Sequence, residues 1–346
     1  MTARGRLSRW SRRRCRSAGV ALLAVAALAP VVAGCADAAG DSSDGRLQVA
    51  TTVAPITSIA ANIGGDRVKV TGIVPEGTNS HTFEPKPSVA ELLSTVDVVY
   101  VNGLKLEEPT TELADQSLKD GAEVVDIGSQ TLPERDYIYD FSFPESGGKP
   151  NPHLWTDPLF ARKYAKLIAD DLSQRDPANA DYYAGNYAKF DKLITRFDAA
   201  MRTSFATIPR AKRKLLTYHD AYAYFGKDYG WDIVGAIQVD NFEEPTPKEV
   251  AGLIDQVREQ KVPAIFGSEV FPSPVLEQIG KETGVQYVDV LRDDDLPGAP
   301  GDPEHSWAGL MRFDYITMTE AMGGDASALK ALDTADVAPD GASYPQ

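Results

Sequence analysis

The chain has 346 residues, with 35 Lys and Arg against 50 Asp and Glu, and a formal net charge of −15 at pH 7. An acidic surface of this kind repels nucleic acid and attracts cations, so we expect no nucleic-acid partner. The length exceeds that of one ordinary hydrophobic core and predicts two domains.

The first 34 residues have the three parts of a secretory signal peptide. A basic region with seven arginines and no acidic residue is followed by an apolar run that ends at Cys35. The sequence Val-Ala-Gly-Cys at residues 32–35 resembles the lipobox of bacterial lipoproteins, which implies cleavage before Cys35 and a lipid on its sulfur. Residues 35–46 then form a flexible tether rich in Gly, Ser and Asp. We therefore expect a protein anchored by lipid to the outer face of the cell membrane.

Two alternatives remain for this segment. The apolar run is close to the ~18 residues at which a membrane-spanning helix becomes plausible, so it could be a transmembrane anchor. The arginines at 12–14 could belong to a twin-arginine export signal instead of the general secretory one. Loss of residues 1–34 removes seven arginines and leaves 28 basic against 50 acidic residues, a net charge of −22. Cys15 leaves with the signal and Cys35 is acylated, so the folded part offers no thiol for a disulfide or a metal.

Strands and helices alternate along the rest of the chain. The expected strands are mostly continuous apolar runs, as in parallel strands covered on both faces. They are residues 47–52, 68–74, 97–102, 123–127, 214–218, 232–237, 264–268 and 286–291. Helices are expected at residues 55–63, 88–94, 111–119, 247–259 and 274–283. The pattern predicts an α/β fold of two similar lobes, each with a mostly parallel sheet flanked by helices.

One long helix is expected between the two halves, at residues 180–208. Apolar side chains recur along it at steps of three and four. They are Tyr183, Tyr187, Phe190, Ile194, Phe197, Met201 and Phe205. At 1.5 Å per residue such a helix is roughly 40 Å long. We expect it to join the lobes, residues 47–179 and 209–325, as a rigid element that limits their rotation, and we expect a flexible tail at residues 326–346.

Three of the four histidines lie where an expected strand or loop ends. His81 follows the second strand, His153 ends a long irregular stretch just before a helix, and His219 follows the fifth strand. Ligands bind beyond the carboxyl ends of the strands in open α/β sheets, so we expect these imidazoles to meet in one crevice. The eighth strand ends in Asp293, Asp294 and Asp295, one of which can reach the same crevice. Because imidazole is the commonest protein ligand for a borderline divalent metal, the pattern indicates a metal clamped between the lobes.

Each of these residues taken alone has a simpler interpretation. A single loop histidine is more often exposed or hydrogen-bonded than a ligand, and a run of aspartates is usually a solvated turn. His305 lacks the position at a strand end, and we interpret it as a surface or helix-start residue. Carboxylates near turns and prolines are expected to cap helices or form ion pairs; they are Glu84, Glu243, Glu244 and Glu269. Three histidines in equivalent positions nevertheless favour a shared site.

From Val49 to about Met322 the chain resembles the metal-binding lipoproteins of bacterial ABC importers, the zinc and manganese group known as cluster A-I. The most specific motif is Asn-Pro-His-Leu-Trp-Thr-Asp-Pro at residues 151–158, and IGGDRVKVTGIVPEGTNSHTFEPKPS and LRDDDLPG also match. The resemblance implies two lobes joined by one rigid helix. It also implies one metal site, made by His81, His153, His219 and Asp294. Asp294 occupies the place of the family's Asp-Ser-Leu aspartate, although Asp293 or Asp295 could compete with it.

The third ligand bears on which metal is bound. His219 stands where manganese members tend to have Glu, and three imidazoles with one carboxylate suit tetrahedral Zn²⁺. The Irving-Williams order favours zinc over manganese as well. One departure is that zinc members often carry a His-rich loop before the second ligand, whereas residues 133–150 contain no histidine. We expect zinc, with manganese as the alternative.

The predicted function is capture of the metal outside the membrane by a monomeric protein that is not an enzyme and that delivers the ion to an ABC permease. Four protein ligands would leave no position for an activated water, and separation of the lobes would release the ion. A surface-tethered zinc hydrolase is the alternative from another class; it needs an open coordination position and a general base. The chain has no His-Glu-x-x-His pattern that would support it. A structural or adhesive surface lipoprotein is a third interpretation.

Overall fold

The computed structural model describes residues 45–238, 245–268 and 274–346. Residues 1–44, with the expected signal peptide and Cys35, lie outside the described residues, as do Glu243, Glu244 and Glu269. Within the described part, no helix is both long enough and apolar enough to cross a lipid bilayer.

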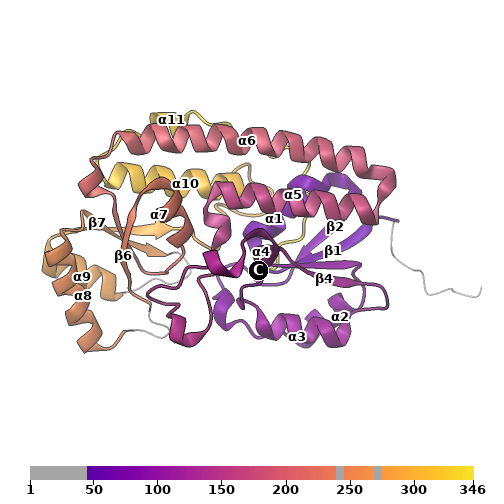
Figure 1. Ribbon diagram of the computed structural model, residues 1–346, viewed down its shortest axis with the longest axis horizontal. Coiled ribbons are helices and arrows are strands. Elements are labelled where there is room, and N and C mark those ends of the chain that lie inside the picture. The colour runs from indigo at the N-terminus through magenta and orange to yellow at the C-terminus, as the bar shows by residue number, and fades with distance from the viewer. Residues whose placement is uncertain (1–44, 239–244, 269–273) are drawn as a thin grey trace, which may run out of the picture. The chain divides into compact units, whose positions relative to one another are not determined.

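The first lobe is built on a four-stranded parallel sheet in the order β2-β1-β3-β4 (Figure 1). The strands are β1 (Leu47–Thr51), β2 (Val68–Gly72), β3 (Val98–Val101) and β4 (Glu123–Asp126). Its helices are α1 (Ala54–Gly64), α2 (Pro87–Leu93), α3 (Glu108–Ser117), α4 (Ile127–Thr131) and α5 (Pro158–Arg175). Val49 pairs with Val70 on one side and Val98 on the other, and all three are buried. Covered strands of this kind explain the continuous apolar runs in the sequence.

The second lobe repeats this arrangement with a four-stranded parallel sheet in the order β6-β5-β7-β8. The strands are β5 (Lys214–Thr217), β6 (Asp232–Ala236), β7 (Ala264–Ser268) and β8 (Gln286–Leu291). Its helices are α7 (Ala223–Tyr229), α8 (Pro247–Gln260), α9 (Pro274–Thr283) and α10 (Trp307–Ala321). The expected fold class, two similar lobes with parallel sheets flanked by helices, is confirmed.

Short helical turns complete the described structure. The 3₁₀ turns are η1 (Gly65–Arg67), η2 (Ser80–Thr82), η3 (Glu134–Asp136), η4 (Glu145–Gly147), η5 (Leu154–Thr156), η6 (Pro177–Asn179) and η7 (Arg210–Lys212). No bounds were predicted for the long helices α5 and α10, which were expected only as helices that follow His153 and His305. The helices α4, α7 and α11 (Ser327–Lys330) were not predicted; they have 5, 7 and 4 residues, too few to display a 3.6-residue period clearly.

Helix α6 (Ala180–Ala206) runs along both lobes, beside α5 and above α10 (Figure 1). The expected apolar stripe is buried, apart from Tyr187, which is partly exposed. Near the middle of α6 the ring of Phe190 lies 5.5 Å from that of Trp307, and near its C-terminal end the ring of Phe205 lies 5.2 Å from that of Trp231. One hydrophobic core therefore includes residues of both sheets and of the helix that joins them.

The C-terminal residues return to the first lobe. Ser343 forms an isolated parallel bridge with Thr71, donates a backbone hydrogen bond to Val70 and accepts one from Gly72. The Tyr344 ring packs at 4.6 Å against the ring of His305. This segment differs from the flexible tail that we expected, because the backbone of Ser343 pairs with β2 and the Tyr344 ring packs against His305.

His305 also differs from the expectation of a surface residue. It precedes the N-cap residue of α10, as a helix-start residue should, but it is only 3% exposed. Its Nε2 atom lies 3.1 Å from a carboxylate oxygen of Glu76, a residue far away in the sequence. Glu84 is exposed.

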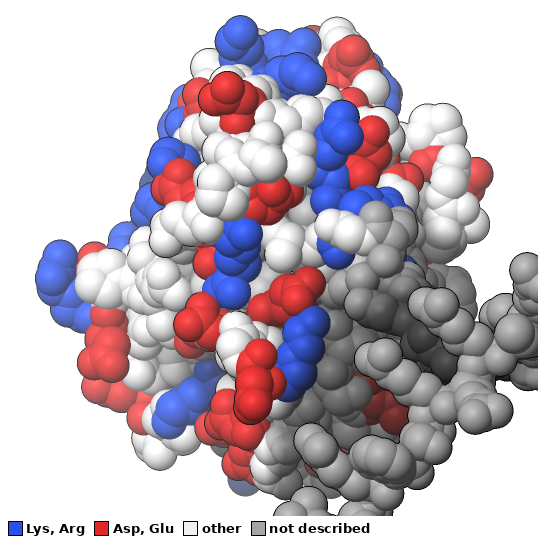
Figure 2. Space-filling view, turned by 90° about the vertical axis from the view of Figure 1, so that its right-hand side faces the viewer, with Lys and Arg blue, Asp and Glu red and all other residues white. Residues whose placement is uncertain are grey.

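Acidic and basic side chains are interspersed on the end of the first lobe shown in Figure 2. This face is therefore not the continuous basic surface that a nucleic acid would need.

Candidate metal centre

His81 lies in η2, in the loop that follows β2. The side chain of Asn79 accepts a hydrogen bond from the backbone nitrogen of His81 at 2.9 Å and so starts the turn. Gly77 adopts a positive φ of 74° in the same loop, and its backbone nitrogen donates to Asp295 at 2.6 Å. The loop is thus bound to the second lobe. His81 is the least buried of the three histidines.

His153 is fixed by the motif around it. Asn151 Oδ1 accepts hydrogen bonds from the backbone nitrogen of His153 at 3.1 Å and from its ring Nδ1 at 2.8 Å. The amide nitrogen of Asn151 donates to the backbone carbonyl of Asp220 at 2.7 Å, which fixes the orientation of the amide. Thr156 donates to the His153 carbonyl, and Asp157 caps α5. Since Nδ1 carries the proton, the buried ring presents Nε2 with its lone pair to the site.

His219 follows β5 and is oriented by a carboxylate of its own lobe. Its Nδ1 atom lies 3.3 Å from Asp293 Oδ2, while Asp293 Oδ1 accepts hydrogen bonds from Ser268 Oγ and the Asp294 backbone nitrogen, each at 3.1 Å. A carboxylate on the far nitrogen of a metal-binding imidazole fixes the ring and increases its basicity. The ring of His219 therefore also directs Nε2 toward the other histidines.

Asp294 is the aspartate whose carboxylate faces the histidines. Ser80 Oγ donates to its Oδ2 at 3.0 Å, whereas its Oδ1 is buried and has no hydrogen-bond partner among the described residues. Oδ1 lies 3.9 Å from His153 Nε2. The carboxylates of Asp293 and Asp295 are directed to His219 Nδ1 and to the backbone of Gly77. An unsatisfied buried oxygen is costly, and a cation would satisfy it.

The structure brings His81, His153, His219 and Asp294 together. His81 Nε2 is 3.1 Å from His153 Nε2 and 3.0 Å from His219 Nε2, and one ligand atom from each of the four residues lies within 4.8 Å of all the others. Donors bound tetrahedrally at 2.0–2.1 Å lie about 3.3 Å apart, so this spacing fits a single small ion. Two donors come from each lobe.

Burial and nearby charges determine the protonation of the donors. Burial lowers the pKa of His81 and of His153 well below the ordinary value, helped by the charge of His219. For His219 burial also lowers the pKa, but Asp293 and Asp294 outweigh it and raise the pKa to about 9. Burial raises the pKa of Asp294 to about 6, although His219 opposes this. Without a metal, two imidazoles are therefore neutral at pH 7, and the proton on His219 must leave before the ring can bind one.

Aromatic rings enclose the cluster. Phe143 lies 5.4 Å from His81 and 5.7 Å from His153, and Trp155 lies 5.0 Å from His153 between ring centroids. Phe143, Ser80 and the orienting roles of Asn151 and Asp293 were not predicted from the sequence. The motif at residues 151–158 pointed to Asn151, but no sequence signal marked Phe143 or Ser80.

Two parallel-sheet lobes that contribute equally to one buried donor set define the class of metal-binding solute-binding proteins. Comparison with known proteins agrees with this class. The family described as ZnuA, the periplasmic component A of the zinc-uptake complex, matches residues 49–321. The chain belongs to this family, which supplies the metal-binding component of ABC importers.

Two relatives illustrate the similarity over nearly the whole protein. The manganese-binding lipoprotein MntA of Halalkalibacterium halodurans is 31% identical over 297 residues, which cover 85% of this chain and 95% of MntA. The iron-binding protein YfeA of Yersinia pestis is 32% identical over 306 residues, which cover 88% of this chain and 96% of YfeA. The resemblance expected from the motifs is confirmed.

Solved structures share the fold. The periplasmic zinc-binding protein TroA from Treponema pallidum aligns with a TM-score of 0.73 at 24% identity, covering 80% of this chain and 99% of TroA. The cadmium-bound periplasmic metal-binding protein from Candidatus Liberibacter asiaticus aligns with a TM-score of 0.70 at 25% identity, covering 80% of this chain and all of that one (100%).

Proposed function

We propose that this protein captures Zn²⁺ with His81, His153, His219 and Asp294 on the outer side of the membrane and delivers it to the permease of an ABC importer. The observation that carries this proposal is the buried cluster of three Nε2 atoms beside an unpartnered carboxylate oxygen. The ligands come in pairs from two lobes, so a small separation of the lobes would weaken the site. Release to a permease requires such a mechanism.

The donor set supports zinc. Ser80 engages one oxygen of Asp294, which leaves a single carboxylate oxygen for the metal and favours four-coordination. Zn²⁺ prefers three nitrogens and one oxygen in a tetrahedron, whereas Mn²⁺ prefers more oxygen donors in an octahedron. Manganese is the second candidate, because MntA is named for manganese binding and is related over most of the chain.

The same closure of the coordination shell supports binding over hydrolysis. A catalytic zinc keeps one position for water and has a general base nearby. Here the neighbouring carboxylates are Asp220, Asp293 and Asp295, and each is engaged by another group; Asp220 Oδ2 accepts a hydrogen bond from the backbone nitrogen of Ser142 at 3.0 Å.

For residues 1–44 we propose export by a signal peptide, cleavage before Cys35 and a lipid anchor on that cysteine, with the folded part acting as a monomer. Two relatives, MntA and PsaA of Streptococcus pneumoniae, are named as lipoproteins, which supports this assignment. Labelling with a radioactive fatty acid tests it, with Cys35→Ala as the control that should lose the label.

Titration calorimetry of the full chain tests the metal. We expect one Zn²⁺ per chain, and we expect Zn²⁺ to displace Mn²⁺ in competition. Zinc at 100 times Kd should raise the free energy of unfolding by about 2.7 kcal/mol, which a thermal shift detects. Tighter binding of Mn²⁺ would support the manganese alternative, and no binding of either metal would refute the proposed site.

A further inference from the structure

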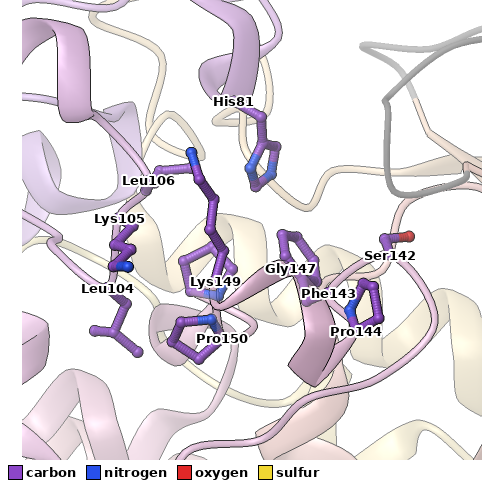
Figure 3. A pocket seen from close by; sticks show the side chains of 11 residues that line it. His81, Leu104, Lys105, Leu106, Ser142, Phe143, Pro144, Gly147, Lys149 and Pro150 are labelled. Carbon is purple, nitrogen blue, oxygen red and sulfur yellow. The ribbon is translucent and has the colours of Figure 1, made fainter.

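A pocket of about 240 Å³ opens beside His81 (Figure 3). Leu104, Leu106, Phe143 and three prolines form much of its wall. In Figure 3 the His81 ring lies between the side chain of Lys149 and the ring of Phe143. His81 is the least buried of the four cluster residues and lines the pocket, so the pocket reaches the edge of the cluster at that residue.

The charge of this pocket is opposite to what a free metal ion would need. Lys105 and Lys149 line it, and its lining residues include no Asp or Glu, although the whole chain has a net charge of −15. Two ammonium groups repel an approaching dication and attract an anion. The charge of the two lysines therefore favours an anionic ligand over a free dication in this pocket.

A structural role explains neither lysine. Lys105 is exposed and has no ion-pair partner among the described residues. Lys149 Nζ lies 2.5 Å from Glu108 Oε2, but the two side chains are 55% and 47% exposed. Exposed pairs of this kind contribute only about 0–1 kcal/mol, so Lys149 can exchange Glu108 for another carboxylate at little cost.

The backbone conformation at Lys105 is a second, independent indication that this pocket binds a ligand. Gly103, Leu104 and Lys105 have φ values of 77°, 52° and 63°, in the left-handed region that non-glycine residues rarely adopt. Each such residue costs on the order of 1 kcal/mol, and strain of this kind clusters at ligand sites. The conformation buries Leu104 and leaves Lys105 at the pocket.

We propose that this pocket receives the carboxylates of a small polycarboxylate that carries the metal ion to the protein. The inference rests on the proposed function of the cluster. The lysines hold the carrier while each metal–oxygen bond to it is replaced by a bond to a protein ligand, beginning at His81. The metal keeps its oxidation state, and the carrier leaves as the free anion. The pocket volume of about 240 Å³ suits a small di- or tricarboxylic acid.

Stopped-flow tryptophan fluorescence of the full chain tests this, because Trp155 lies against His153. The metal is offered either as aquated Zn²⁺ or as the 1:1 zinc citrate complex, which is an anion at pH 7.5. We compare the wild type with Lys105→Ala/Lys149→Ala. The control is Lys192→Ala/Lys212→Ala, which removes the same charge at two exposed positions in α6 and η7.

The pocket variant should load from zinc citrate about tenfold more slowly, while loading from aquated Zn²⁺ stays the same or becomes faster. The control variant should match the wild type with both donors. Equal rates with zinc citrate in all three proteins, or equal slowing with both donors, would overturn the proposal. Lys105→Asn/Lys149→Gln repeats the test with a residue that tolerates positive φ at 105. Failure of the wild type to bind aquated Zn²⁺ would instead refute the proposed function.

Discussion

The imidazole side and the carboxylate side of the cluster are held in different ways. The hydrogen bonds that reach His153 directly come from its own motif, since Asn151 accepts from its backbone and ring nitrogens and Thr156 donates to its carbonyl. Asn151 and Thr156 in turn donate to the backbone carbonyls of Asp220 and Ala221 in the second lobe. The aspartate loop is positioned by the opposite lobe, because Ser80 donates to Asp294 and Gly77 donates to Asp295. Separation of the lobes would therefore break contacts made directly to the aspartates, but only indirect contacts of His153. We accordingly call the His153 side the permanent half and the aspartate side the releasable half of the proposed site.

Replacement of a ligand on the permanent side should have the largest effect. We expect His153→Ala to weaken zinc binding on the order of 1,000-fold, because it removes a fully buried donor and no neighbour can replace it. Calorimetry measures the loss. The melting temperature of the metal-free protein should change little, and zinc binding within tenfold of the wild type would show that His153 is not a ligand.

Lowering the pH should weaken zinc binding, because both His219 and Asp294 then take up protons. The pKa of His219 is about 9, so below that pH each Zn²⁺ must displace one proton and affinity falls about tenfold per pH unit. Between pH 8 and pH 6 we expect a loss of about 100-fold. Below pH 6 Asp294, with a pKa of about 6, also holds a proton and the slope steepens. Calorimetry in buffers of different ionisation enthalpy counts the released protons, and a flat profile from pH 8 to 6 would exclude ligation by His219.

Removal of the group that orients His153 should have an intermediate effect. Asn151→Ala deletes the acceptor for Nδ1, and loss of such a partner typically costs 10–100-fold in metal affinity. The variant should still bind one ion per chain, so the stoichiometry distinguishes a misoriented ligand from a lost one. Wild-type affinity would mean that the surrounding packing alone holds the ring.

The smallest effect is expected on the releasable side. Ser80→Ala frees Oδ2 of Asp294, which could then bind the metal through both oxygens. The preference for Zn²⁺ over Mn²⁺ should fall about fivefold, since a bidentate carboxylate favours the larger coordination number of manganese. Competition between the two metals measures the ratio. An unchanged ratio would indicate that Ser80 only positions the loop.

Much of the fold was predictable because both sheets use covered, continuous apolar strands. Apolar runs such as Val98–Val101 are recognisable as strands from the sequence, and all eight expected strands occur. The short helices α4 and α7 were not predicted, because they form through contacts with the rest of the lobe and show no local hydrophobic period.

The site was predictable to the extent that its residues lie at strand ends or in one specific motif. His81, His153 and His219 were found by position, and the resemblance selected Asp294. The role of Asp293 was not predictable, because three successive aspartates look alike until β8 places one against His219 and another against Gly77. The contact between His305 and Glu76 was not predictable either, because it joins segments that are far apart in the sequence and no local sequence pattern marks it.

The bridge at Ser343 has a further consequence for how this protein meets other polypeptides. Strand β2 lies at the margin of its sheet, where unpaired amides and carbonyls would otherwise invite another polypeptide to add on. By donating to Val70 and accepting from Gly72, the last residues shield that margin. A purification tag fused directly after Gln346 would be attached close to this bridge, and it would risk exposing the edge of β2 that Ser343 covers.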